Sequence, residues 1–481
     1  MLVKLSNGRS VPIELHRIKI VQKTELQPID LRLKKILEAG CNTFILKSKD
    51  VFIDMLTDSG TNAMSDNQLA AMMVADDAYA GSESFFKLQS SIKDVLGFKF
   101  VLPTHQGRAA EHLISRVLIK PGDTVIMNYH FTTSKVHVLF AGGVVEELCI
   151  DEALNTQSSH PFKGNMDIEK LKNSIKKHGR EKIAFIRMEA TTNLLGGQPF
   201  SMDNLKKVRK IAEANDIPLV LDGSLIAENA ILIKRREKGF EKRSVESIIR
   251  EIMSLIDVFY FSGRKSSSSR GGAIATNNKA LFDRMAPFLP VFEGFFTYGG
   301  MSSKEMEAMA VGIREMADDD VAGTVLDFVQ FFVNRCVEEK IPAVTPAGGL
   351  ACHIDAMKFL PHIKQSEYPA GALAAAMFLV SGVRGMERGT ISMERNKDGS
   401  EAFADIELLR LAVPRRVFTV SHIEFAVDRL KWLFINRHLI HGLKFFEEPP
   451  VLRFFVGKLR PVDDWMEKLV MKFKKDFGDS A

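Results

Sequence analysis

Between residues 95 and 280 the chain alternates short apolar runs with longer amphipathic segments. The short runs are bounded by turn residues, which is typical of strands covered on both faces, and they predict strands at 98–102, 124–127, 144–148, 183–188, 218–221 and 258–261. The amphipathic segments predict helices at 108–118, 202–214 (capped by Ser201) and 245–255. This alternation implies right-handed crossovers. We therefore expect an α/β fold with a mostly parallel, doubly wound sheet, whose functional residues lie at the carboxyl ends of the strands.

The pattern changes after residue 300. Helices are predicted at 306–316 and 325–339, and the strands that follow, at 351–354 and 408–413, are shorter and separated by helices. Short strands separated by helices predict a second, smaller α+β domain. The expected division is an N-terminal segment at 1–55 that joins the small domain, a large domain at 56–320, the small domain at 321–462 and an extra helix at 463–481.

The last of these segments is amphipathic. Large apolar residues recur there at helical spacing, opposite a row of lysines: Trp465, Leu469, Phe473 and Phe477 against Lys468, Lys472 and Lys475. Such a helix can pack on its own subunit or on a neighbouring one, or it can bind a membrane surface.

Composition narrows the class of protein. The 65 basic and 60 acidic residues among 481 are interspersed, so the net charge of +5 indicates a mildly basic surface and no nucleic-acid partner. The four cysteines are far apart and include no C-x-x-C pair, which argues against a zinc site or a disulfide framework. A reduced, cytoplasmic location follows most simply. Because there is no signal-peptide pattern and no apolar stretch long enough to span a bilayer, we expect neither export nor a membrane partner.

Three predicted strands lead to polar residues that could meet in one crevice. Asp222 follows the strand at 218–221, Asn193 follows 183–188, and Lys265 follows 258–261 within S-G-R-K-S-S-S-S-R-G-G. Each alone has an ordinary explanation, as a turn cap, an Asx-turn or a solvated lysine. Together they suit a cofactor with an aldehyde on a pyridine ring, because it needs a lysine to form a Schiff base and a carboxylate to keep the ring nitrogen protonated.

That cofactor also carries a phosphate group. The segment T-H-Q-G-R-A-A-E-H opens the helix at 108–118, so Gln106, Gly107 and Arg108 would direct backbone N–H groups, the helix dipole and a guanidinium at an anion. A glycine at a helix start often serves packing alone. Its place in the chain order favours phosphate binding.

Longer motifs extend this interpretation over roughly residues 15–460. They are L-T-D-S-G-T-N-A-M-S-D from Leu56, D-A-Y-A-G-S from Asp77, P-T-H-Q-G-R from Pro103, F-T-T from Phe131, G-G-Q-P from Gly196, A-E-N-A from Ala227, E-G-F-F-T-Y-G-G from Glu293, M-E-R-G from Met386, L-L-R-L-A-V-P-R-R-V-F-T from Leu408 and L-R-F-F from Leu452. In this ordered series the chain resembles the pyridoxal-phosphate-dependent β-eliminating lyases, most closely the tyrosine phenol-lyases and next the tryptophanases. The resemblance implies the aspartate-aminotransferase-like fold (fold type I), pyridoxal phosphate as cofactor, active sites at a dimer interface and a homotetramer.

The resemblance also assigns roles by matching position. Lys265 forms the Schiff base and removes the Cα proton, Asp222 pairs with the pyridine nitrogen, and Tyr79 protonates the leaving carbon from the neighbouring subunit. The other cofactor contacts are Phe131 (ring stacking), Asn193 (the phenolic oxygen) and Gln106, Gly107, Arg108 and Ser262 (the phosphate). The substrate contacts are Arg410 (the carboxylate, a task suited to a bidentate fork), Thr57 and Ser59 in the segment that assists it, Thr132 and Arg388 (the phenol hydroxyl) and Phe295 (the phenol pocket).

Several positions depart from the family pattern. Leu225 stands where the family has an arginine near the cofactor oxygen, Leu350 stands for a histidine near the site, and Phe295 replaces a methionine of the phenol pocket. The loop after Lys265 lacks an asparagine whose carbonyl helps bind a monovalent cation, and the matching carboxylate is Asp77 instead of glutamate. Arg264 or Arg270 could replace the potassium ion with a fixed charge, or the loop is restructured. The sequence therefore does not decide between these alternatives and a potassium site near Asp77.

The expected activity is β-elimination of L-tyrosine to phenol, pyruvate and ammonia. A lyase of the same chemistry that acts on tryptophan, an S-substituted cysteine or another β-substituted alanine is the nearest alternative, because one pocket substitution can change substrate preference. An aminotransferase shares Lys265, Asp222 and Arg410 but has no need of Tyr79 or Arg388. A protein that has lost catalysis and serves in binding or assembly is a further alternative.

Overall fold

The computed structural model describes residues 1–478 and divides the chain into two compact units. The larger unit comprises Ser59–Asn155 and His160–Leu326. The smaller comprises Met1–Asp58, Thr156–Ser159 and the described residues from Asp327 onward. Each unit is built around hydrophobic clusters of its own.

A seven-stranded sheet forms the centre of the larger unit, with the order β4-β10-β9-β8-β7-β5-β6. Its strands are β4 (Phe100–Thr104), β5 (Thr124–Met127), β6 (Val144–Glu147), β7 (Ile183–Glu189), β8 (Leu219–Asp222), β9 (Val258–Ser262) and β10 (Gly272–Thr276). The neighbours from β9 to β6 are parallel, and only β10 runs antiparallel, to both β9 and β4. The predicted mostly parallel sheet is therefore confirmed, with one antiparallel strand that the hydrophobic pattern did not indicate.

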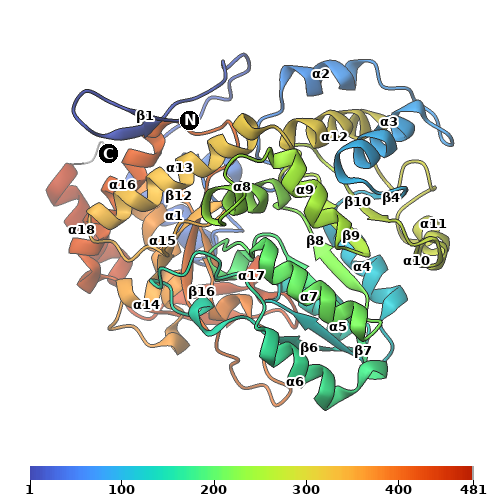
Figure 1. Ribbon diagram of the computed structural model, residues 1–481. Helices are drawn as coiled ribbons and strands as arrows, with labels where there is room; N and C mark the ends of the chain where they lie inside the picture. The colour runs from blue at the N-terminus through green and yellow to red at the C-terminus, as the bar shows by residue number, and fades with distance from the viewer. Residues whose placement is uncertain (479–481) are drawn as a thin grey trace. The chain divides into compact units, whose positions relative to one another are not determined.

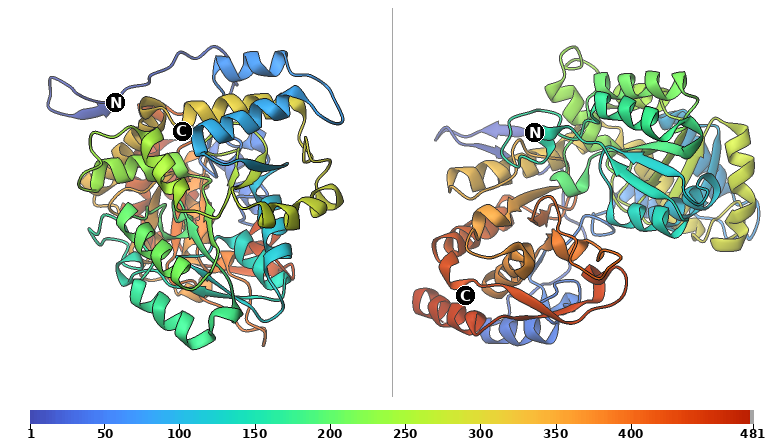
Figure 2. Two further views of the ribbon diagram at one scale, coloured as in Figure 1. Left: turned by 45° about the vertical axis from the view of Figure 1, so that its right-hand side comes forward. Right: turned by 90° about the horizontal axis from the view of Figure 1, so that it is seen from below.

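Helices cover both faces of this sheet (Figures 1 and 2). One face packs against α4 (Gly107–Leu118), α5 (Thr132–Phe140) and α10 (Lys279–Met285). The other packs against α3 (Glu83–Ser91), α6 (Ile168–His178), α7 (Met202–Ala214), α8 (Ile226–Arg236), α9 (Val245–Ser254) and α12 (Ser303–Met316). Successive residues of a strand point to opposite faces, so Leu221 enters one core and Val220 the other. The remaining helices of this unit are α2 (Asp66–Met73) and α11 (Leu289–Phe292).

The smaller unit contains a three-stranded antiparallel sheet, ordered β11-β14-β13, from β11 (Ala351–Asp355), β14 (Leu408–Ala412) and β13 (Met386–Arg388). The helix α15 (Pro369–Ser381) is buried along its whole length, which explains why its sequence is apolar on all sides. Around it lie α1 (Ile29–Glu38), α16 (Val420–Ile435) and α18 (Trp465–Phe477). The unit also includes part of α13 (Asp319–Glu338), α14 (Ala356–Phe359), α17 (Arg453–Val456) and the strand pairs β1 (Leu2–Lys4) with β2 (Ser10–Pro12), β3 (Ile53–Asp54) with β12 (Val383–Arg384), and β15 (Leu443–Glu447) with β16 (Lys458–Pro461).

The C-terminal helix α18 packs within its own chain. Trp465, Leu469 and Phe473 are fully buried in the core of the smaller unit, and the right-hand view of Figure 2 shows α18 beside α1. The apolar face is therefore occupied and is not available to a membrane surface. Across residues 1–478, no helix is long and apolar enough to cross a bilayer.

Candidate active site

The candidate site of the larger unit lies where four neighbouring parallel strands end. Asp222 is the last residue of β8, Asn193 follows β7, Phe131 follows β5, and Lys265 follows β9. In parallel strands the carboxyl ends share one edge of the sheet, which brings these residues together as the sequence predicts.

Lys265 lies in the loop between β9 and β10. The two ends of that loop are joined where Gly263 N donates to Gly271 O at 2.8 Å, and the side-chain amide of Asn62 donates to the carbonyl of Lys265 at 2.8 Å. The Lys265 ammonium lies 5.2 Å from the centroid of the Phe131 ring. A constrained backbone thus presents a flexible amine beside an aromatic face.

The serines after Lys265 are structural. The Ser266 hydroxyl donates to Glu228 Oε2 at 2.9 Å and the Ser267 hydroxyl donates to Gly263 O at 2.7 Å, both in buried surroundings. Ser266 and Ser267 therefore hold the loop from within, because buried hydroxyl groups generally form hydrogen bonds.

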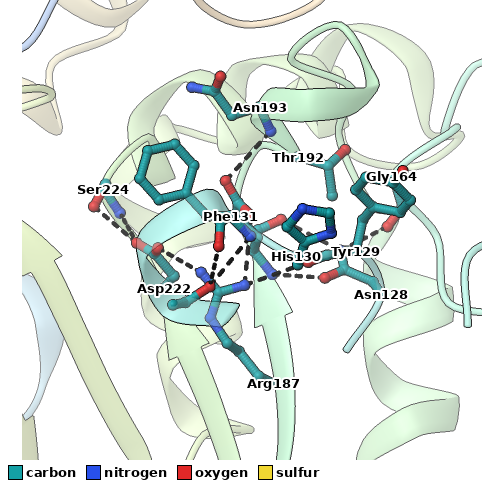
Figure 3. Close-up of polar contacts among 12 residues, drawn as sticks. Asn128, Tyr129, His130, Phe131, Gly164, Arg187, Thr192, Asn193, Asp222 and Ser224 are labelled. Atoms are coloured by element: carbon teal, nitrogen blue, oxygen red, sulfur yellow. Dashed lines mark hydrogen bonds and ion pairs between the residues drawn. The ribbon is translucent and has the colours of Figure 1, made fainter. Parts of the chain in front are cut away.

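Asp222 is buried and receives hydrogen bonds on both oxygens (Figure 3). Its Oδ1 accepts from the Ser224 hydroxyl at 2.7 Å and from Ser224 N at 3.1 Å. Its Oδ2 accepts from Arg187 Nη2 at 2.7 Å and from the Tyr260 hydroxyl at 3.2 Å. The carboxylate is thus fixed in position.

Two further acids lie in this buried region. Burial raises the pKa of Glu189 to about 7, with Arg187 acting against the rise and Asp222 adding to it. Burial likewise raises the pKa of Glu111 to about 7, and Asp222 adds to that rise. Glu189 Oε1 accepts from the backbone N of Asn193 at 3.3 Å, which connects this acid to the strand-end residues.

The expected phosphate site combines a close backbone approach with several arginines. A Cβ on Gly107 would lie 3.0 Å from the Ser262 Cβ, so a side chain at this position would press on the end of β9. Gln106 precedes the first turn of α4, and Arg108 is exposed in that turn. Burial lowers the pKa of Arg264, and Arg270 and Arg108 lower it further. Clustered arginines beside a helix N-terminus fit a phosphate group.

Tyr79 and Phe295 belong to an aromatic group in the same unit. Their rings stack with centroids 5.7 Å apart, and Tyr298 meets Tyr79 edge-on at 5.5 Å. The Tyr79 side chain is 74% exposed. A hydrogen bond with Tyr298 raises the pKa of Tyr79.

Arg388 and Arg410 lie in the smaller unit on neighbouring strands. Met386 of β13 pairs with Arg410 of β14, so Arg388, two residues further, points to the same face as Arg410. Arg410 donates to Leu56 O at 2.9 Å, and the Arg388 guanidinium lies 5.6 Å from the Phe454 ring centroid. Burial lowers the pKa of Arg410 well below its ordinary value, and Arg388 lowers it further.

A histidine lies beside this pair although Leu350 replaces the one that the family pattern led us to expect. His353 of β11 pairs with Arg410 across the sheet and is fully buried. Burial lowers its pKa to about 3, and Arg410 and Arg388 lower it further, so the imidazole is neutral.

The remaining expected residues are placed as follows. Thr132 is buried in the first turn of α5. Thr57 and Ser59 are partly buried on either side of the division between the two units. Asp77 is exposed, and no group of three His, Cys, Asp or Glu side chains gathers as a metal site anywhere in residues 1–478. A Cβ on Gly60 would lie 2.8 Å from Arg264 Nε, so this guanidinium fills the space beside the Gly60 backbone.

Four buried residues of this region are not predicted from the sequence: Arg187, Glu189, Tyr260 and Glu111. One signal was present: Arg187 and Glu189 occupy alternate positions of F-I-R-M-E, so both point to one face of a strand that is otherwise apolar. Two charged residues on a single buried face require partners there.

Comparisons with known proteins identify the family of the chain. The β-eliminating lyase family model matches residues 54–429. A tyrosine phenol-lyase from Symbiobacterium thermophilum is 46% identical over 93% of this chain and 98% of its own, and one from Nostoc punctiforme is 43% identical over 92% and 96%.

Among solved structures, a variant serine palmitoyltransferase from S. paucimobilis with a bound aldimine of pyridoxal phosphate and myriocin superposes with a TM-score of 0.57 at 12% identity, over 81% of this chain and 89% of its own. An aminotransferase from Staphylococcus aureus gives 0.56 at 16% identity, over 80% and 94%. At this sequence distance the structures bear on the fold alone, and the expected fold type I architecture is confirmed.

Proposed function

Because this chain belongs to the β-eliminating lyase family, we propose that it uses pyridoxal phosphate to cleave L-tyrosine to phenol, pyruvate and ammonia. The observation that carries the substrate assignment is Arg388, which is buried with Arg410 on one sheet face. The high identity to several tyrosine phenol-lyases supports it. A guanidinium at this position is suited to bind a phenol oxygen.

The residues at the strand ends fit the cofactor. Asp222 would hold the ring nitrogen, Phe131 would stack on the ring, and Asn193 would contact the phenolic oxygen. Gly107 lets the start of α4 pack closely on Ser262, and Gln106 and Arg108 at the same helix start would bind the phosphate. When bound, pyridoxal phosphate supplies a cationic ring that takes up negative charge from the substrate Cα.

The protein residues then bind the substrate and move protons. Arg410 binds the substrate carboxylate, assisted by the segment that contains Thr57 and Ser59. The Lys265 amine takes the Cα proton, and Arg388 and Thr132 hold the phenol oxygen. Tyr79 donates a proton to the ring carbon that leaves; with an ordinary pKa of about 10, a tyrosine hydroxyl carries this proton at neutral pH.

The pocket also contains Phe295 where the family pattern has a methionine. Its ring stacks on Tyr79. A larger ring at this place reduces the room for the leaving group, so the test below includes S-methylcysteine, whose leaving group is smaller than phenol.

The test is to supply the cofactor-loaded protein with L-tyrosine, L-tryptophan and S-methylcysteine in parallel and to measure pyruvate, ammonia and the released side chain, with Lys265→Ala as the control. Phenol and pyruvate in equal amounts from tyrosine, lost in the control, are expected. Pyruvate from another substrate alone would keep the lyase chemistry and overturn tyrosine. Amino transfer to a keto acid without free ammonia would overturn both.

Assembly and ion dependence are further parts of the proposal. We expect a homotetramer in which Tyr79, exposed in the single chain, acts in the active site of a neighbouring subunit, and sedimentation analysis of the holoenzyme tests this. Activity assayed with and without potassium tests the cation site that the family pattern suggests near Asp77. The four free, buried cysteines accord with a reduced, cytoplasmic location.

A further inference from the structure

A row of buried polar side chains crosses three strands of the large sheet at the candidate site. Glu189 of β7, Asp222 of β8 and Tyr260 of β9 stand in register across three parallel strands. Arg187 is two residues before Glu189 and therefore points to the same face. All four are at least 95% buried.

A single guanidinium contacts all three members of that row. Arg187 Nη2 donates to Asp222 Oδ2 at 2.7 Å, Nε donates to the Tyr260 oxygen at 2.9 Å, and Nη1 lies 3.4 Å from Glu189 Oε2. The Tyr260 hydroxyl in turn donates to Asp222 at 3.2 Å. Arg187 thus reaches the carboxylate directly and through Tyr260 (Figure 3 shows its contact with Asp222).

The charge on Arg187 is permanent, whereas its acidic neighbours can take up protons. Burial alone would lower the pKa of Arg187, but Tyr260, Glu189 and Asp222 together raise it above its ordinary value. Glu189 and Glu111 have pKa values near 7. The fixed cation of Arg187 lies 2.7 Å from the Asp222 carboxylate, where it stabilises negative charge.

On the basis of the proposed function, we propose that Arg187 is a positioning residue that keeps Asp222 ionised, so that the proton shared between Asp222 and a bound pyridine ring stays on the ring nitrogen. A shared proton rests on the stronger of two bases. Donors that stabilise the carboxylate weaken it as a base and leave the proton on nitrogen.

A purely structural role for Arg187, as counter-charge for the buried acids, makes a different prediction. In that case Arg187→Met would fail only because Glu189 loses its partner, and the double variant Arg187→Met/Glu189→Gln would restore wild-type behaviour. If Arg187 acts on Asp222, the double variant recovers folding but leaves the cofactor ring altered. This variant also keeps the test valid if the single one does not fold.

The experiment loads each variant with pyridoxal phosphate labelled with ¹⁵N in its ring and measures the ring nitrogen shift and the cofactor dissociation constant. Arg384→Met, which removes a guanidinium–Asp54 pair in the smaller unit, is the matched control. In wild type and control the shift of a protonated pyridine is expected. In the double variant the shift should move toward neutral pyridine, and binding should weaken by about tenfold, the equivalent of one charge-assisted hydrogen bond.

A protonated ring nitrogen in the double variant, with unchanged affinity, would overturn the role of Arg187 and leave the proposed function intact. Wild-type protein that binds no pyridoxal phosphate would overturn the proposed function itself. Neither readout depends on which amino acid is cleaved.

Discussion

Arg388 and Arg410 share a sheet face but have separate tasks in the proposed reaction. Arg388→Met removes the donor for the phenol oxygen, so kcat/KM for tyrosine should fall about 10- to 100-fold, the value of a charged hydrogen bond. Pyruvate release from S-methylcysteine, which has no phenol, should be nearly unchanged. Arg410→Met should impair both substrates, because both carry a carboxylate. Steady-state kinetics measures the activity of each variant on both substrates. If Arg388→Met lost activity on S-methylcysteine as strongly as on tyrosine, the division of tasks would be contradicted.

His353 makes folding stability depend on pH. The unfolded chain protonates this histidine below a pH of about 6.5, whereas in the folded state its pKa is about 3 because of burial and the nearby Arg410. The contribution of the neutral His353 to the free energy of unfolding is therefore present above pH 6.5 and is lost as the pH falls. From pH 6.5 to 5 the free energy of unfolding of wild type should drop by about 2 kcal/mol relative to His353→Gln. Urea titrations at both pH values measure this difference, and a constant difference would disprove it.

For single residues, the sequence predicts a functional side chain where a polar residue of the right chemistry follows a strand. Lys265, Asp222 and Asn193 could be predicted because each follows an apolar strand. Arg187 and Tyr260 could not, because their partners come from other strands and no local pattern specifies which strands are neighbours.

The approach of α4 to β9 depends on the absence of a side chain at Gly107. In Gly107→Ala the added Cβ would lie 3.0 Å from Ser262, so the start of α4 must shift. Displacement of this kind typically costs about 1–3 kcal/mol, and we expect cofactor affinity to fall at least about fivefold. Gly323→Ala is the control, since there the nearest atom is the flexible end of Arg235. Equilibrium dialysis compares the two variants, and equal affinities would contradict the close-approach argument.

The helix α18 contributes to the core of the smaller unit. Phe473→Ala should lower the free energy of unfolding by about 3–5 kcal/mol because it leaves a cavity. Met471→Ala, at a position that is 64% exposed, should change it by less than about 0.5 kcal/mol. Denaturant unfolding of both variants tests the packing of this helix. A small effect of Phe473→Ala would show that α18 is only loosely attached.

Elements with strong periodicity were predictable to the residue. The strand β5 and the helix α7 have the predicted bounds, and the Ser201 side chain caps α7 by accepting from Asn204 N. The helix α13 begins six residues before the predicted 325, because its first turn is acidic and not apolar. The strand β10 is built from G-A-I-A-T, and such small residues give too weak an apolar signal to predict a strand.

For the whole molecule, cofactor binding should appear as added stability. A ligand at a hundred times its dissociation constant adds about 2.7 kcal/mol to the folded state. Pyridoxal phosphate should therefore raise the midpoint of thermal unfolding of the apoprotein, and Lys265→Ala should show a smaller rise because it cannot bond the aldehyde. Calorimetry with and without cofactor measures this, and equal rises in both proteins would argue against a bond to Lys265.

Some long-range features have no local signature. Residues 156–159 belong to the smaller unit, where the Thr156 hydroxyl donates to Asp355 Oδ2 at 2.6 Å and Thr345 N donates to Thr156 O at 2.9 Å. The partners are almost 200 residues apart. Helix and strand periodicity carries no information about such contacts.

The pairing of α1 with α18 has a consequence for biosynthesis. Nearly all of the larger unit is encoded between Ser59 and Leu326, so a growing chain can fold it before translation is complete. The core of the smaller unit needs both Ile36 of α1 and Phe473 of α18. The N-terminal part of that core must therefore wait, with its apolar surface uncovered, until almost the entire chain has left the ribosome, and this interval is when a chaperone would be needed.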